Sequence, residues 1–350
     1  MIFTDALIIG AGPVGLFQIF QFGLLDIKCH VIDALPYPGG QCIELYPDKP
    51  IYDIPGTPRT TGRELTASLL KQAEPFNATL HLGQTVTAVE KSIDSTFAVE
   101  TSHGTQFKTK VIVIAAGVGA FQPKKLAVDG LAQFENSQLF YHASDAANTV
   151  GKHVVVVGGG DAALQCSIDL ANHGGVKRVT LLHRRDVYHA APSVVAQAKA
   201  LQHVGKLIAT VGQVTGFESA DGKLTAVSIT GVGGTASSFA VDTLLVYLGL
   251  SPKLGPLADW GLDMQRKQIA VDTEKFATSV PGVFAVGDIN TYPGKKKLIL
   301  SGFHECALAA FGAANIVFPG KNPQLEYTTS STRLHRLLGV DGQDSGKTNA

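Results

Sequence analysis

The chain contains little cysteine and no excess of charge of either sign. Its four cysteines, Cys29, Cys42, Cys166 and Cys306, include no C-x-x-C pair among 350 residues. Such scattered cysteines support neither a zinc site nor a disulfide framework, so we expect no metal. The 29 basic and 29 acidic residues balance, which leaves no global field to attract nucleic acid or an anionic membrane. We therefore expect neither as a partner.

One long stretch, Ala6 to Leu25, lacks charge altogether, but it contains Pro13, several glycines and two glutamines. A membrane helix needs about 20 predominantly apolar residues. The interruptions instead predict a buried strand, a turn and a buried helix. No basic segment precedes the stretch and no small-residue cleavage pattern follows it, so we expect a cytoplasmic protein without a membrane segment.

The glycines of this stretch form a dinucleotide-binding pattern, Gly10-x-Gly12-x-x-Gly15, with Pro13 inside it. In such a pattern the first glycine allows a tight turn, the second lets the backbone approach a pyrophosphate, and the third packs helix against sheet. The phosphates then meet the N-terminus of the helix. Asp33 ends the next predicted strand, 23 residues after Gly10, and its carboxylate suits a ribose hydroxyl.

A second pattern, Gly158-x-Gly160-x-x-Ala163, follows the predicted strand His153 to Val157 and contains Asp161. Its next strand ends in His183-Arg184-Arg185 instead of an acid. Guanidinium groups are planar donor forks that match a phosphate, so the pattern favours NADP over NAD. A solvated strand end would leave the same arginines exposed without a ligand.

Strand, helix and strand recur in the same order after both glycine patterns. The sequence therefore predicts an α/β protein made of two Rossmann-like three-layer nucleotide-binding domains, with the second domain inserted into the first. We expect the outer domain to comprise residues 1–118 and 249–350, with a C-terminal extension at 320–350, and the inserted domain to comprise 119–248.

Smaller elements are predicted from the periodicity of apolar residues. Three short antiparallel strands are expected at 84–91, 96–102 and 105–108, and a separate buried strand at 111–115. A helix is expected at 302–316, and a long ordered Pro/Gly-rich loop at 36–58.

These motifs together resemble the two-domain, FAD-containing pyridine-nucleotide reductases, of which thioredoxin reductase is the best-known type. The resemblance also includes Gly39-Gly40-Gln41, Ala115-Ala116-Gly117 and Gly287-Asp288. Thioredoxin reductases carry a redox-active C-x-x-C before the second glycine pattern, where this chain has only Tyr141 to Asp145. Without that dithiol the closer resemblance is to the thioredoxin-reductase-like ferredoxin:NADP reductases, which share the long loop and a hydroxyl-rich C-terminal run.

The resemblance implies a role for particular residues. Asp33 would bind the adenosine ribose, Gln41 the ribityl chain or ring edge, and Asp288 a ribityl hydroxyl. Tyr46 would stack on the flavin and Thr329, from this or a partner subunit, would cover its other face. Val86 would lie against adenine and Phe121 would border the flavin. The implied FAD residues are Gly10, Gly12, Pro13, Gly15, Asp33, Gly40, Gln41, Tyr46, Val86, Phe121, Asp288 and Thr329. The implied NADP residues are Gly158, Gly160, Asp161, Ala163, His183, Arg184 and Arg185.

The activity implied by the resemblance is electron transfer between NADPH and ferredoxin or flavodoxin, with hydride passing to FAD and single electrons leaving it. A homodimer is implied as well. Acidic carriers would need a basic surface, and the available residues are Lys124, Lys125, Lys295, Lys296, Lys297, Arg333 and Arg336.

Several alternatives stay open at this point. The enzyme could instead be an NADPH-dependent flavin reductase or oxidase that uses quinones or other small acceptors, or the protein could be a nucleotide sensor without activity. Tyr46 could be a loop anchor, and the run 328–332 a solvated linker. Family members commonly have a further arginine where this chain has Tyr188-His189, and Tyr327 is a second candidate for covering the flavin.

Overall fold

The structure is a computed structural model that describes residues 1–141, 149–172, 175–321 and 327–340. Within these ranges it leaves undescribed the side chains of Phe121, Gln122, Val232, Leu250, Pro252, Lys253 and Ala258. The chain divides into two compact units, Met1–Phe121 with Pro252–Ala350, and Gln122–Ser251. The divisions fall three residues after the predicted boundaries at 118 and 248. The connections between the units, β9 (Ala120–Pro123) and β17 (Leu250–Lys253), pair with each other.

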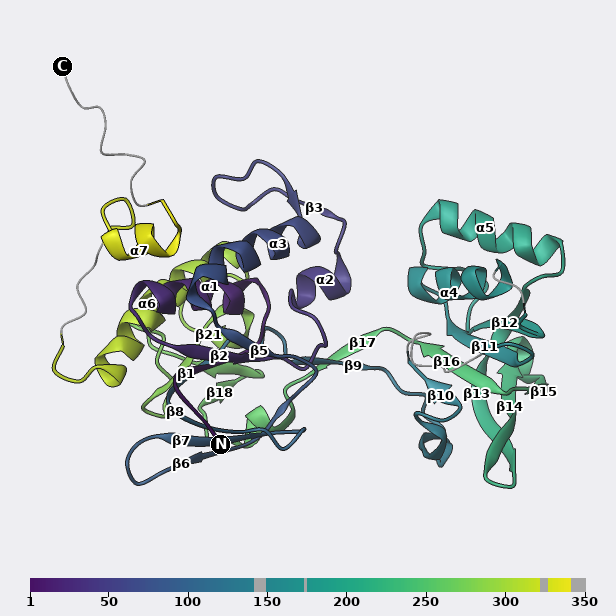
Figure 1. The fold of residues 1–350 in the computed structure, drawn as a ribbon. Coiled ribbons are helices and arrows are strands. Elements are labelled where there is room, and N and C mark those ends of the chain that lie inside the picture. The colour runs from purple at the N-terminus through teal and green to yellow at the C-terminus, as the bar shows by residue number, and fades with distance from the viewer. Residues whose placement is uncertain (142–148, 173–174, 322–326, 341–350) are drawn as a thin grey trace, which may run out of the picture. The chain divides into compact units, whose positions relative to one another are not determined.

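The first unit is built on a mixed sheet of seven strands (Figure 1). Its strands run in the order β5 (Thr79–His81), β2 (Cys29–Ile32), β1 (Ile2–Ile9), β8 (Gln106–Ile114), β7 (Phe97–Thr101), β6 (Val86–Lys91), and β20 (Val283–Ala285) also pairs with β8. The first four strands are parallel, and β6, β7 and β8 form an antiparallel meander. The stretch predicted as strand, turn and helix is therefore β1 followed by α1 (Pro13–Leu24).

The predicted separation of residues 105–108 from 111–115 is wrong. Residues 106–108 and 111–114 belong to one strand, β8, which changes its hydrogen-bonded neighbour along its length. Its first half pairs antiparallel with β7, while Ile112 to Ile114 pair in parallel with β20. Thr109 and Lys110 have the composition of a break but continue the ladder, because Thr109 is buried and its hydroxyl donates to backbone carbonyls.

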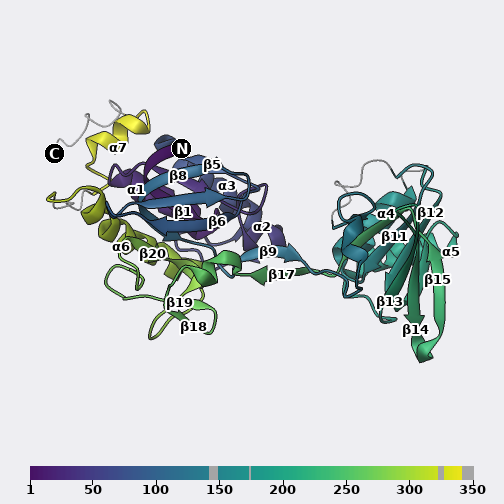
Figure 2. The same cartoon turned by 90° about the horizontal axis from the view of Figure 1, so that it is seen from below.

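Side chains alternate across the sheet, as the strand period of two requires, and supply two apolar layers. Ala6 and Ile8 of β1 face α1, α3 (Gly62–Ala73) and α6 (Ile299–Val317), whereas Leu7 and Ile9 face the opposite side. That opposite side is covered by side chains of β6 and β7 and of residues 254–289, including β18 (Met264–Gln265), β19 (Gln268–Ala270) and η5 (Gly255–Asp259). Figure 2 shows this layering.

Local chemistry sets where several helices begin. Thr61 caps α3, because its hydroxyl accepts from Glu64 N at 3.2 Å while Glu64 accepts from Thr61 N at 2.8 Å. The predicted helix at 302–316 starts three residues earlier, at Ile299. By length and composition α6 could cross a membrane, but nine of its residues are buried in the core of the first unit, and core helices pass the same test.

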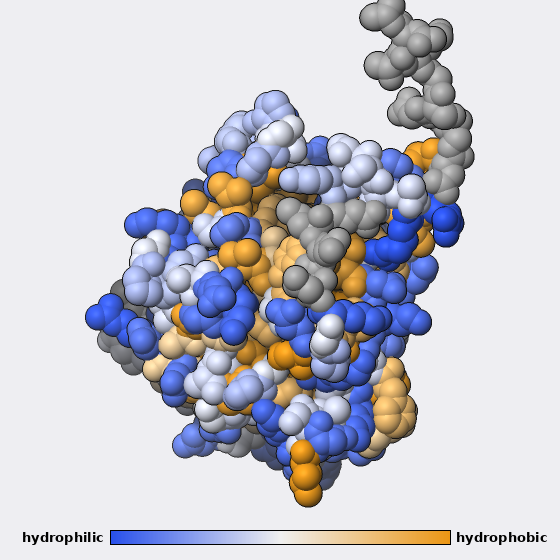
Figure 3. All heavy atoms as spheres, turned by 90° about the vertical axis from the view of Figure 1, so that its left-hand side faces the viewer, coloured by the Kyte–Doolittle hydropathy of each residue, from blue (hydrophilic) through white to orange (hydrophobic). Residues whose placement is uncertain are grey.

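The remaining short elements of the first unit lie in its connections. They are α2 (Gln41–Leu45), β3 (Pro50–Ile51), β4 (Thr60–Thr61), η1 (Glu74–Phe76), η6 (Gly287–Ile289), β21 (Asn290–Thr291) and α7 (Thr332–Leu337). The predicted loop at 36–58 thus contains one short helix and one short strand. Figure 3 shows apolar and polar side chains next to one another on one face.

The second unit repeats the plan on its own sheet of seven strands. Their order is β10 (Leu139–Phe140), β16 (Thr243–Tyr247), β11 (His153–Gly158), β12 (Arg178–His183), β13 (Ile208–Ala220), β14 (Lys223–Gly231) and β15 (Ala236–Ala240). The pairs from β10 to β13 are parallel and the last two are antiparallel. Helices α4 (Asp161–Asn172) and α5 (Pro192–His203) cover one face. The predicted α/β class with two repeated nucleotide-binding folds is confirmed.

Candidate functional site

The first glycine turn joins β1 to α1 and leaves no room for side chains. A Cβ on Gly10, whose φ is +112°, would lie 2.4 Å from the carbonyl oxygen of Ala115. A Cβ on Gly15 would lie 1.9 Å from the carbonyl oxygen of Gly10, so helix and strand approach as closely as backbones allow. These contacts are those that the sequence pattern requires of its first and third glycines.

A second loop meets this turn at Gly12. A Cβ on Gly40, whose φ is +52°, would lie only 3.0 Å from the Cα of Gly12. No side chain caps the N-terminus of α1 at Gly12, so the first amides of that helix are available to an anion. Side chains on these two glycines would fill the space over the helix end. The turn therefore fits a dinucleotide pyrophosphate.

Asp33 lies directly beside the glycine turn. Its carboxylate accepts from the amide of Ala11 at 2.5 Å and from the amide of Leu35 at 2.8 Å. Burial raises the pKa of Asp33, and the two amide donors oppose that rise without cancelling it. Each carboxylate oxygen has a second lone pair, so Asp33 can hold the turn and still accept from a ribose hydroxyl.

Gln41, Tyr46 and Asp288 lie in the same part of the first unit. The side-chain amide of Gln41 lies over Gly117, where a Cβ would come within 3.2 Å of Nε2. Tyr46 ends α2, and its hydroxyl is 3.6 Å from the Cys42 thiol. Burial is the main cause that raises the pKa of Tyr46, and the charge of Asp288 adds to it. Tyr46 therefore stays a neutral phenol near the Asp288 carboxylate.

Three other predicted FAD residues are placed less favourably or are not placed. The Val86 side chain is buried in the apolar layer with Leu7 and Ile32, so only its backbone could meet an adenine. Phe121 belongs to β9, but its side chain lies outside what the structure describes. Thr329 is exposed and precedes α7, which docks on the C-terminal end of α1, the end remote from Gly12.

Arg333 joins α7 to the end of α1. Its guanidinium Nη2 donates to the carbonyl oxygens of Gly23 and Leu24, each at 2.6 Å, and Nη1 is 3.5 Å from Asp26. These are among the last carbonyls of α1, which carry the negative end of the helix dipole. Within one subunit, α7, which begins three residues after Thr329, therefore lies at the end of α1 opposite the glycine turn (Figure 1).

The second glycine turn, between β11 and α4, has the same tight geometry. A Cβ on Gly158 would lie 2.5 Å from the carbonyl oxygen of Tyr247 and 2.7 Å from the Cβ of Ala163. The middle residue of the turn, Gly159, was not predicted as a site residue. Its neighbour in space is the His183 ring, 2.3 Å from where a Cβ would stand. The local spacing of the pattern carries no signal for this contact.

A short segment after β12 folds back over this turn. His189 N donates to the carbonyl oxygen of Gly159 at 2.7 Å, and the Asp161 carboxylate accepts from Ala191 N at 2.7 Å. His183 stacks on Tyr188 with ring centroids 5.9 Å apart. Burial is the main cause that lowers the pKa of His183, and the nearby arginine charges lower it further. A neutral His183 thus supports the turn, and Asp161 holds the segment that follows the arginines.

Arg184 and Arg185 are exposed at the C-terminal end of β12, beside the second turn. Neither has an ion-pair partner in the part of the chain that the structure describes. Two free guanidinium groups near a helix N-terminus provide a site for a phosphate monoester. The resemblance led us to expect a further arginine after this pair, but the chain has Tyr188-His189 there. The Tyr188 ring stacks on His183, and the His189 amide donates to Gly159.

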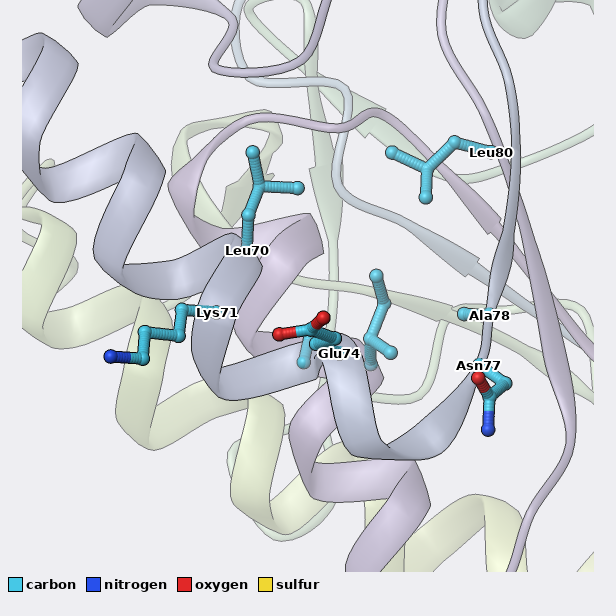
Figure 4. A pocket seen from close by; sticks show the side chains of 8 residues that line it. Leu70, Lys71, Glu74, Asn77, Ala78 and Leu80 are labelled. Atoms are coloured by element: carbon cyan, nitrogen blue, oxygen red, sulfur yellow. The ribbon is translucent and has the colours of Figure 1, made fainter. Parts of the chain in front are cut away.

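Two surface hollows of the first unit contain none of the predicted site residues. One, of about 510 Å³, is lined by Ile19, Leu70, Lys71, Ala73, Glu74, Asn77, Ala78 and Leu80 (Figure 4). The other, of about 530 Å³, is lined by residues of β1, β2 and β8 together with Lys28 and Thr96. No group of three or more His, Cys, Asp or Glu side chains is arranged to hold a metal among the residues described.

Two glycine turns of the dinucleotide-binding type, one on each of two repeated domains, are typical of oxidoreductases that use two nucleotide cofactors. Residues 4–306 match the family described as pyridine nucleotide-disulphide oxidoreductases, and the chain belongs to this family. A protein of Polaromonas sp. named ferredoxin–NADP reductase is 62% identical over 97% of this chain and 93% of its own length. One of Cupriavidus necator named ferredoxin–NADP reductase 2 is 60% identical over 96% and 91%.

Solved structures give the same result for the fold. A thioredoxin reductase of Lactococcus lactis is similar with a TM-score of 0.57 and 25% identity, over 90% of this chain and 99% of that one. The resemblance to thioredoxin-reductase-like ferredoxin:NADP reductases predicted from the sequence is confirmed, and the protein is an oxidoreductase.

Proposed function

We propose that the protein is an FAD-dependent reductase that takes hydride from NADPH and delivers electrons singly to ferredoxin or a flavodoxin. One observation carries this assignment: two equivalent glycine turns are followed by opposite charges, Asp33 in one unit and the pair Arg184 and Arg185 in the other. The names of relatives about 60% identical over nearly the whole chain support the choice of ferredoxin as acceptor.

The first unit would hold FAD. Gly10, Gly12 and Gly40 would admit the pyrophosphate, Asp33 would accept from the adenosine ribose, and Gln41 and Asp288 would contact the ribityl side. Tyr46 would pack on the flavin, and the Val86 backbone and Phe121 would border the cofactor. When bound, FAD supplies the exchange between two-electron hydride chemistry and one-electron transfer. The chain itself needs no acid–base residue for that exchange, only close and oriented contacts.

The second unit would hold NADPH. Gly158, Gly160 and Ala163 would admit its pyrophosphate at the N-terminus of α4, and Asp161 and His183 would keep the turn in shape. Arg184 and Arg185 would bind the 2'-phosphate that distinguishes NADPH from NADH. This preference would rest on charge-assisted hydrogen bonds at a solvent-exposed position.

The cysteines favour direct electron transfer from flavin to acceptor. All four are free and buried. Burial raises the pKa of Cys29 to about 12 and also raises the pKa of Cys42, Cys166 and Cys306. Disulfide exchange requires an accessible thiolate, which none of these side chains offers. Reduction of thioredoxin through a dithiol would therefore fail.

The position of the C-terminal extension supports a homodimer. Arg333 holds α7 on the far end of α1, so Thr329 would have to cover the flavin of a partner subunit and not its own. Tyr327, which is 70% exposed, would be offered to the partner in the same way.

Fewer basic residues are available to an acidic partner than the sequence suggested. Lys295 is buried against Glu305, and Arg333 is occupied at the end of α1, so neither is available for docking. Lys296 and Lys297 are exposed in the first unit, and Lys124 in the second. Charges at such positions would chiefly raise the association rate, and this effect would weaken with salt.

The deciding experiment is anaerobic mixing of the purified holoenzyme with NADPH, followed by ferredoxin with cytochrome c as final acceptor. Rapid, salt-sensitive ferredoxin reduction, with none of thioredoxin plus a disulfide, is expected. Flavin that is reduced but passes electrons only to quinones would replace the proposal with a small-acceptor reductase. Flavin that NADPH does not bleach would leave a nucleotide-binding protein without this activity.

A further inference from the structure

A buried ion pair lies beneath the loop that carries Asp288. Glu305, in the middle of α6, is 0% exposed, and the Lys295 side chain that contacts it is 6% exposed. Neither residue belongs to the glycine turns or to any predicted cofactor site. A charged pair in a core is costly unless its hydrogen bonds are complete, so its presence calls for a specific role.

Glu305 accepts from four donors. Oε2 accepts from Gly287 N at 2.6 Å and from Asn290 Nδ2 at 2.8 Å. Oε1 accepts from the Tyr292 hydroxyl at 2.9 Å and from Lys295 Nζ. All four donors belong to the segment 287–295, so one carboxylate holds this connection after β20 by hydrogen bonds at four of its residues. An amide at this position could not accept them all, because its NH₂ group is a donor.

Lys295 also contacts Gly287, on its carbonyl side. Its Nζ donates to the Gly287 carbonyl oxygen at 2.9 Å, while Glu305 accepts from the Gly287 amide. Both polar backbone atoms of Gly287 are therefore held by the pair. Gly287 has a φ of +79°, a conformation that other residues rarely adopt, and Asp288 follows it directly.

The clamped loop is packed on the N-terminus of α1. A Cβ on Gly287 would lie 3.3 Å from a methyl group of Val14, and a Cβ on Gly302 would lie 2.4 Å from one. Val14 thus fits between the loop and α6. Gly302 and Glu305 are three residues apart on α6, which places them on one face of the helix. The same face that receives Val14 holds the Asp288 loop.

We infer that Glu305 and Lys295 are positioning residues for the flavin half of the cofactor, because they fix the loop that carries Asp288, the residue proposed to contact the ribityl chain. The inference rests on the proposed FAD site. It assigns no contact with the cofactor to either residue. The adenosine half is held elsewhere, by Asp33, and does not depend on the pair.

The test compares FAD with ADP, which lacks the ribityl and flavin groups, on apoprotein of the full chain. FAD is titrated by quenching of flavin fluorescence, and ADP by competition with FAD. For E305Q we expect the FAD dissociation constant to rise at least about tenfold, the effect of losing charge-assisted hydrogen bonds. The ADP constant should change less than about threefold, since none of the hydrogen bonds removed holds the adenosine side of the site. The absorption bands of the bound flavin should also shift.

Two further variants distinguish a specific loss of FAD binding from a general loss of folding. The double variant E305Q/K295M removes both charges, leaves no buried ion unpaired, and should lose FAD affinity to a similar extent while it stays folded. V317A creates a cavity at the far end of α6 and should lower the melting temperature without changing FAD affinity. Unchanged FAD affinity in E305Q and in the double variant, or equal losses for FAD and ADP, would overturn the inference. A wild-type apoprotein that binds no FAD would overturn the proposed function instead.

Discussion

The imidazole ring of His183 occupies the space that a side chain on Gly159 would need, since a Cβ there would lie 2.3 Å from the ring. Gly159→Ala should therefore displace His183 from Tyr188 and move the start of the arginine segment. We expect the dissociation constant for NADP⁺ to rise about tenfold, as for loss of a positioned charge-assisted bond, with FAD content unchanged. Calorimetric titration measures this. Gly216→Ala, where a Cβ meets only ordinary contacts, is the matched control and should bind NADP⁺ normally.

Arg184 and Arg185 should determine the choice between the two nicotinamide cofactors. The double variant R184Q/R185Q loses the charged donors for the 2'-phosphate, so its KM for NADPH should rise about 10- to 100-fold, while its KM for NADH stays the same. Steady-state rates with both cofactors give the ratio. R178Q changes an exposed arginine at the other end of β12 and should keep the wild-type ratio. Equal losses with NADPH and NADH would argue against a phosphate site.

Arg333 should anchor the C-terminal extension. R333A removes the donors to Gly23 and Leu24 and should lower the free energy of unfolding by about 1–2 kcal/mol, with faster proteolysis in the extension. R333K keeps the charge but not the planar fork and should recover only part of the loss. Chemical denaturation with limited proteolysis measures both effects. R59A, at an exposed arginine, controls for loss of a surface charge; an equal effect there would refute the anchoring role.

The pair His30 and His81 should make stability depend on pH. Their ring nitrogens are 2.9 Å apart, and burial lowers the pKa of both below the ordinary value of 6.5. The unfolded chain then binds protons at a pH where the folded chain does not, so stability falls as the pH drops through 6.5. Melting temperatures between pH 7.5 and 5.5 should fall less steeply in H81Q than in the wild type, whereas H103Q, at an exposed position, should match the wild type.

The parts of the fold and site that are local in sequence could be predicted. The turn at Gly10 to Gly15 and its partner Asp33 follow from spacing alone, because the tight turn, the helix and the strand end lie within about 25 residues, as the motif requires. The second turn and the two exposed arginines follow from the same pattern. The family resemblance added Gln41, Tyr46 and Asp288, which the structure brings into one region.

The contacts that no sequence motif specifies could not be predicted. Lys295 and Arg333 read as free surface cations, but each is engaged by a group that only the folded chain brings near, Glu305 in one case and the end of α1 in the other. The contact of Gly159 with His183 is of the same kind. A single glutamate inside the small-residue stretch of α6 was the one local signal for the buried pair.

Strand β8 changes its neighbour from β7 to β20 along its length, and this affects the order in which the two units can fold during synthesis. The half of this strand from Ile112 to Ile114 needs β20 as its neighbour, and β20 emerges from the ribosome only after the whole of residues 122–251. The inserted unit has all of its own strands by then and can complete its sheet first. The outer unit, which began first, closes last, so a nascent chain stalled before Val283 would expose the apolar flank of β8 to chaperones.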